Sequence, residues 1–113
     1  MKIYHNPRCS KSRQTLSLLI DNDVDPEIYE YLKTPPTAEE LNEVIKMLGI
    51  KPFDLIRKGE AIYKEKYKGK ELSDKAWVDA MVENPKLIER PIVIDGNQAR
   101  LGRPPELVLE LLG

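Results

Sequence analysis

Hydrophobic and polar positions follow two different periods along this chain, and together they predict a definite order of strands and helices. Residues 2–4 form a short apolar strand pattern, which Asn6-Pro7 interrupts because a residue before proline is kept out of the helical region. A helical pattern then runs from about Cys9 to Asn22 and is followed by alternation over residues 27–31. Strand, helix and strand within roughly thirty residues predict a right-handed βαβ unit with parallel strands.

The first helix is expected to bury one face. Its members recur at helical spacing and are Ser12, Leu16, Leu19 and Ile20.

The middle of the chain is predicted to be helical. Thr37 and Glu40 have the spacing of a capping box, and Gly49 stands where the helix would end. Residues 52–56 predict a further short helix, which carries Arg57 at its end.

The stretch 58–70 is rich in lysine and glutamate. Its mixture of acid and base favours a solvated surface over a basic docking strip. Ser73 then caps another helix, and Pro85 stops it. Trp77 matches the apolar stripe of that helix, so we interpret it as a core residue rather than a ligand-stacking one.

The end of the chain predicts a β-hairpin and a last helix. Residues 92–94 are a compact apolar run, residues 95–97 have the composition of a tight turn, and residues 98–101 return as the partner strand. A helix then begins at Pro104-Pro105. Its expected buried residues are Leu107, Val108, Leu111 and Leu112.

This order of elements matches a thioredoxin-like α/β fold with a four-stranded mixed sheet. With 113 residues, the chain is expected to be a single domain. The helices at about 36–85 form an insertion between the βαβ unit and the hairpin.

The composition narrows the range of possible functions. Eighteen basic residues against 19 acidic ones argue against a general nucleic-acid binder, and no apolar run is long enough to predict a membrane span. A single cysteine cannot form an internal disulfide, and no signal peptide precedes the first strand, so a cytoplasmic protein is expected. One cysteine and one histidine cannot build a structural zinc site, and we expect no metal.

The candidate chemistry lies at Cys9, where the first strand gives way to a helix. Free amides and the positive end of the helix dipole stabilise an anion there. A thiol in that position, with cationic neighbours, titrates well below its usual pKa of about 8.5. His5, Arg8, Lys11 and Arg13 all lie close by in sequence. We therefore interpret Cys9 as a thiolate nucleophile rather than a small buried hydrophobic residue.

Four segments of the chain resemble the glutaredoxin-coupled arsenate reductases of the ArsC family, and most closely its short bacterial YfgD-type branch. They are residues 3–13 (IYHNPRCSKSR), 55–58 (LIRK), 89–93 (ERPIV) and 100–105 (RLGRPP). The resemblance extends over nearly the whole chain. It implies the fold described above and a cis peptide bond before Pro91, beside the cysteine loop.

The resemblance also implies a reaction. Cys9 would attack arsenate, while Arg57, Arg90 and Arg103 converge on the oxyanion, which a rigid guanidinium fork suits. Glutathione, as co-substrate, would displace the arsenic adduct, glutaredoxin would recycle the mixed disulfide, and arsenite would leave. No tightly bound cofactor is implied, and we expect a monomer.

Three further residues support this site. His5 either favours the Cys9 thiolate or is simply hydrogen-bonded to the backbone. Ser12 replaces the second cysteine of a Cys-x-x-Cys frame, so an outside thiol must resolve the adduct. Arg13 adds positive charge to the loop.

Two other functions stay open. One is a thiol-redox enzyme of the same fold with a substrate other than arsenate. The other is a transcriptional regulator like the Spx proteins, which share the fold and bind RNA polymerase. Many of those carry Cys-x-x-Cys, so Ser12 counts against this second alternative.

Overall fold

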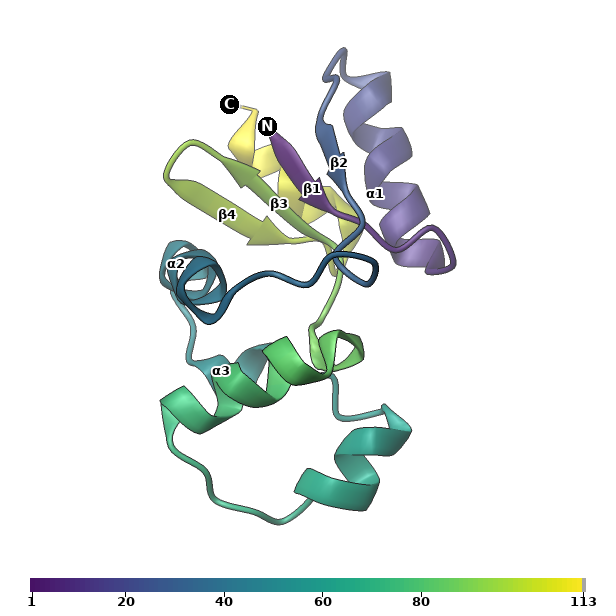
Figure 1. Cartoon of the computed structure of the whole chain (residues 1–113). Helices are drawn as coiled ribbons and strands as arrows, with labels where there is room; N and C mark the ends of the chain where they lie inside the picture. Colours follow the sequence, from purple (N-terminus) through teal and green to yellow (C-terminus); the bar gives the residue numbers. More distant parts are fainter. Residues whose placement is uncertain (113) are drawn as a thin grey trace. The chain divides into compact units, whose positions relative to one another are not determined.

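The computed structural model describes residues 1–112, which divide into two compact units, residues 1–34 with 90–112 and residues 35–89. The first unit contains a four-stranded sheet in the order β2-β1-β3-β4 (Figure 1). Its strands are β1 (Lys2–Tyr4), β2 (Glu27–Tyr29), β3 (Ile92–Asp95) and β4 (Gln98–Leu101).

The sheet is mixed, as the sequence predicted. β1 pairs in parallel with β2, and it pairs antiparallel with β3, which continues through the predicted hairpin into β4. Ile3 stands at the centre of this pairing, opposite Ile28 on one side and Val93 on the other. The second strand ends at Tyr29, two residues earlier than its alternation suggested. The topology is that of a thioredoxin-like α/β fold.

The core of this unit joins both ends of the sequence. Helices α1 (Ser10–Asp21) and η4 (Pro105–Leu111) pack against the sheet. The cluster at their junction consists of fully buried apolar side chains, namely Ile3, Leu19, Val93 and Val108. Each such side chain contributes about 1.5–3 kcal/mol relative to full exposure. The loop between β1 and α1 is therefore anchored on both sides.

The buried face of α1 differs from the predicted one. Ser12, Thr15 and Leu19 are buried, whereas the side chain of Ile20 is 57% exposed. At about 100° per residue, Ile20 lies roughly 80° around the helix from Ser12 and so falls beyond the edge of the buried stripe. The prediction for Ile20 was wrong because apolar character was given more weight than helical angle.

The last helix is a 3₁₀ helix, not the α-helix that its apolar spacing suggested. Three residues per turn align Pro105, Val108 and Leu111 on one face. Pro105 and Val108 are buried, and Leu111 packs against the core cluster. Leu107, expected to be buried, is 37% exposed because the tighter helix turns it away, and Leu112, which follows the end of the helix, is also 37% exposed against expectation.

The second unit is built from α2 (Ala38–Leu48), η1 (Pro52–Leu55), η2 (Tyr63–Tyr67), α3 (Asp74–Glu83) and η3 (Pro85–Leu87). The predicted capping box is present, since Thr37 Oγ1 accepts from the Glu40 amide and the Glu40 carboxylate accepts from the Thr37 amide. Gly49 ends α2 with a φ of 72°, a conformation that favours glycine. The short π-helix η2 within the Lys/Glu-rich stretch was not predicted.

Trp77 is a core residue of the second unit, as predicted, with 4% exposure. Its ring lies 5.0 Å from Phe53, 6.5 Å from Tyr63 and 6.0 Å from Tyr67, measured between centroids. In residues 1–112 no helix combines the length and apolarity that crossing a membrane requires.

Candidate active site

Cys9 occupies the N-cap position of α1. Its amide donates to the Asn6 carbonyl at 3.0 Å, which closes a tight turn, and its own carbonyl accepts from the Arg13 amide at 3.0 Å. The thiol is half-buried. The first free amides of α1 are therefore available to the sulfur, as a helix N-terminus requires.

Two of the predicted arginines, Arg90 and Arg103, lie at this sulfur. Nη2 of Arg103 is 3.8 Å from Cys9 Sγ, and its Nε donates to the Arg90 carbonyl at 2.7 Å. Arg90 is buried, with 9% exposure, and interacts with the thiol through its guanidinium. The Arg90–Pro91 bond is cis, which confirms that expectation, and Arg103–Pro104 is also cis.

The pKa of the Cys9 thiol lies below its ordinary value of 9.0. Burial alone raises this pKa, because desolvation disfavours the thiolate. Hydrogen bonds from the Ser12 amide and from Arg90, the positive charge of Arg90 and a hydrogen bond from the Lys11 amide outweigh that effect. The backbone of α1 and one buried guanidinium together favour the reactive anion.

His5 and Ser12 form a buried polar pair beneath the loop. Ser12 Oγ lies 2.6 Å from His5 Nδ1 and also accepts from the Asn6 amide at 3.0 Å. Ser12 is fully buried, and His5 is 6% exposed. These contacts connect the loop to the first turn of α1, so Ser12 has a structural part beyond replacing a second cysteine.

The pKa of His5 lies below 6.5. Burial is the main cause, the charge of Glu30 opposes it, and Arg13 adds to the lowering. A neutral imidazole at pH 7 offers the thiolate a hydrogen-bonded scaffold but no positive charge. That His5 favours the thiolate stays a prediction, and its ring contact runs to Ser12.

The other predicted residues have separate surroundings. Arg13 Nη1 donates to the Pro7 carbonyl at 2.9 Å, which ties α1 to the loop. Arg57 belongs to the second unit, where its Nε lies 3.3 Å from a carboxylate oxygen of Glu60. That Arg57 joins the oxyanion site stays a prediction. Residues 1–112 contain no cluster of histidine, cysteine or carboxylate side chains arranged to hold a metal ion.

Sequence reasoning missed Gly102 and Thr15. The Gly102 amide donates to the Pro91 carbonyl at 2.9 Å, directly before Arg103. A Cβ on Gly102 would lie 2.7 Å from Thr15 Oγ1 and 2.8 Å from Pro91 Cγ, so only glycine lets these elements approach so closely. The glycine within residues 100–105 (RLGRPP) was the available signal for a tightly packed backbone, but a single sequence does not reveal which segment approaches it.

Comparison with known proteins places the chain in a class. The model of the ArsC family matches residues 4–111, which is nearly the whole length. The chain therefore belongs to the ArsC family.

Individual relatives agree with this assignment. The YfgD protein of Escherichia coli K12 is 53% identical over 115 aligned positions, covering 100% of this chain and 97% of that protein. An arsenate reductase of Haemophilus influenzae is 45% identical over 97% of each chain. The solved structure of an arsenate reductase from Vibrio cholerae superposes with a TM-score of 0.93 at 51% identity, covering 96% of this chain and 94% of that one.

We expect alkylation of Cys9 by iodoacetamide to follow a titration curve whose midpoint lies below the ordinary thiol value of 9.0. Replacing Arg90 by Gln should move this midpoint upward, because it removes both a hydrogen bond and a positive charge from the thiolate. Rates measured by mass spectrometry across pH give both values, and Arg100→Gln is the control. A wild-type midpoint at about 8.5 or above would contradict the activated thiolate.

Gly102→Ala should lower the free energy of unfolding by about 1–3 kcal/mol, because the added methyl overlaps Thr15 and Pro91. Gly59→Ala, where a Cβ meets nothing within 4 Å, is the matched control and should change stability by less than about 1 kcal/mol. Urea unfolding measures both. In a double-mutant cycle, Thr15→Ala should partly relieve the cost of Gly102→Ala. Strict additivity would show that the two sites do not compete for space.

His5 should make the free energy of unfolding decrease as the pH is lowered below 6.5. Its folded pKa lies below 6.5, so below that pH the unfolded chain takes up the proton before the folded one does. The stabilisation is complete above 6.5 and is lost as pH falls through the folded pKa. NMR titration of this single histidine, with urea unfolding of wild type and His5→Asn at several pH values, tests this. Identical pH dependence of the two proteins would refute it.

Proposed function

We propose that this chain is an arsenate reductase that uses the Cys9 thiolate as nucleophile and depends on glutathione and glutaredoxin. Its ArsC membership and the arsenate reductases among its relatives support the reaction class. The observation that carries the proposal is the contact of Cys9 with Arg90 and Arg103 at the start of α1. An oxyanion placed before the sulfur would meet helix amides and two guanidinium groups.

The reaction would proceed in balanced steps. The Cys9 thiolate attacks arsenic, an S–As bond forms, and one arsenate oxygen leaves as water after protonation. A glutathione thiolate then attacks the Cys9 sulfur, the S–As bond breaks, and its electron pair stays on arsenic, which leaves as arsenite. A glutaredoxin thiol reduces the Cys9–glutathione disulfide, so two thiols in total supply two electrons.

The need for an outside thiol follows from the cysteine content of the chain. Cys9 is the single cysteine, and the position three residues on is the buried Ser12. An enzyme without a resolving cysteine needs a second thiol from solution. In this proposal Arg57 completes the oxyanion site with Arg90 and Arg103.

The decisive experiment compares arsenate reduction by wild type, Cys9→Ser and Ser12→Ala, with glutathione and glutaredoxin present. Cys9→Ser should abolish activity. Ser12→Ala should keep most of it, because the backbone amide that lowers the Cys9 pKa is unchanged, although the lost buried hydroxyl should cost about 1–3 kcal/mol of stability.

If wild type reduced arsenate equally fast without glutaredoxin, the proposed dependence on glutaredoxin would be contradicted. Absence of arsenite with a still-reactive thiolate would instead favour a thiol-redox enzyme with another substrate. Equal losses in the two variants would mean that Ser12 acts directly on the sulfur.

A further inference from the structure

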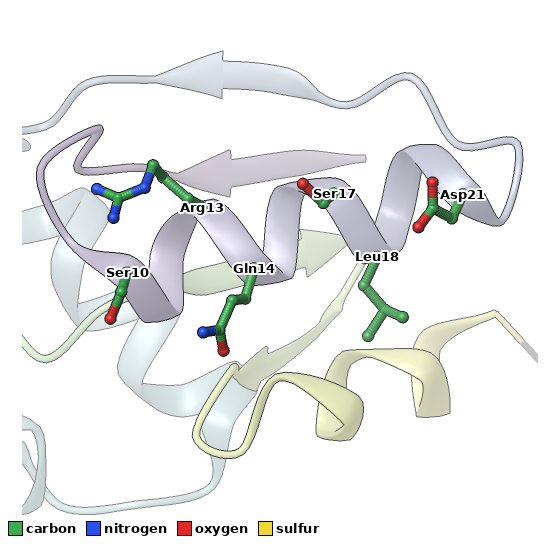
Figure 2. A pocket seen from close by; sticks show the side chains of 6 residues that line it. All are labelled: Ser10, Arg13, Gln14, Ser17, Leu18 and Asp21. Atoms are coloured by element: carbon green, nitrogen blue, oxygen red, sulfur yellow. The ribbon is translucent and has the colours of Figure 1, made fainter.

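Two surface hollows flank the cysteine loop. One, of about 350 Å³, runs along the outer face of α1 and is drawn in Figure 2. The other, of about 260 Å³, lies at the carboxyl ends of the parallel strands β1 and β2, and we call it the strand-end hollow. Its lining comes from two segments, residues 5–8 and residues 30–33. In open α/β sheets, ligands bind outside the carboxyl ends of parallel strands.

The strand-end hollow is lined in part by the segment that leads into the nucleophile. The four residues 5–8 that line it come immediately before Cys9, whose amide bonds back to Asn6 at 3.0 Å. His5 and Asn6 are buried, with 6% and 8% exposure, and form its inner wall. A ligand held by Arg8 is thus one residue away from the catalytic sulfur along the loop.

The charges of this hollow are of both signs. Arg8 and Lys33 supply two cations, and Glu30, which also lines it, supplies one carboxylate. Glu30 and Lys33 pair at 3.4 Å, with Lys33 76% exposed, so this exposed pair is weak and its members can exchange partners. Pro7 and the partly exposed Leu32 add apolar surface.

The α1 hollow has a different composition. Its one cation, Arg13, already donates to the Pro7 carbonyl, and its one carboxylate is Asp21. Figure 2 shows these two side chains near opposite ends of the helix. It offers no second cation.

We propose that the strand-end hollow binds the outside thiol, and that this thiol is a small peptide with two carboxylates and one ammonium group, the chemistry of glutathione. The proposal rests on the proposed function, whose second step needs such a thiol. Arg8 and Lys33 bind the two carboxylates, and Glu30 binds the ammonium group. The central thiol of the peptide then faces the loop that carries Cys9.

Binding can be tested without turnover. The probe is S-methylglutathione, which cannot react, added to the Cys9→Ser protein and followed by NMR of backbone amides. Shifts should be concentrated at residues 5, 6 and 8 and at residues 30–33, since Pro7 has no amide proton. Shifts confined to residues 10–21 would place the thiol in the α1 hollow and overturn the proposal, as would no shifts at all.

Kinetics supply the matched comparison. Arg8→Gln and Lys33→Gln should each raise the KM for glutathione by about threefold to tenfold, the effect of one charge-assisted contact. Lys33→Gln should leave the KM for arsenate and the rate with 2-mercaptoethanol unchanged, because that thiol has no carboxylate. Lys46→Gln is the control, because Lys46 is 75% exposed and forms a similar i,i+3 pair with Glu43 outside the hollow.

The outcomes separate the two proposals. If Arg8→Gln and Lys33→Gln both reduce arsenate normally with an unchanged KM for glutathione, the strand-end hollow is not the glutathione site. The proposed function would still stand. A protein that reduces no arsenate but shows the expected NMR shifts would keep the hollow and reject arsenate as substrate.

Discussion

Stabilisation of a negative charge on a half-buried sulfur is the interaction on which this structure depends. Burial alone raises the pKa of the Cys9 thiol, and two helix amides and the guanidinium of Arg90 outweigh that effect and lower the pKa. The amides belong to Lys11 and Ser12, directly after the cysteine, whereas the guanidinium belongs to Arg90, 81 residues after Cys9 in the sequence. The fold of the first unit is what brings the two together.

Close packing fixes the second arginine. The Gly102 amide bonds to the Pro91 carbonyl, and Arg103 then reaches the Arg90 carbonyl through Nε. The absent side chain at Gly102 lets Thr15 of α1 approach the hairpin. The guanidinium of Arg103 is thus held by backbone contacts, which leaves its outer nitrogen directed at the sulfur.

Local patterns predicted most of the fold, because they depend on neighbours in sequence. The capping box at Thr37, the hairpin around Gly96 and the helix start at Cys9 all have short-range causes. Features that depend on tertiary packing were predicted wrongly. Ile20 is exposed, and the final helix is a 3₁₀ helix with three residues per turn.

The site residues also divide into those predictable from local sequence and those that depend on packing. Cys9 was identifiable from its position before a helix, whereas the contribution of Gly102 depends on an approach between distant segments. Arg90 and Arg103 were named through family resemblance, since an arginine at a chain break has no local signal for what it will contact. The neutral state of His5 could not be predicted either, because it results from burial.

The pairing of β1 with β3 has a consequence for the newly made protein. Ile3 is synthesised well before its partner Val93, which follows only after all of residues 35–89. Such non-local contacts form late in folding, because a long loop must close first. Until then Cys9 has neither Arg90 nor Arg103 beside it, so the unfinished chain lacks the guanidinium contribution that lowers the pKa of this thiol. Since susceptibility to oxidation follows thiolate character, the cysteine gains its full reactivity only when Arg90 and Arg103 have folded against it.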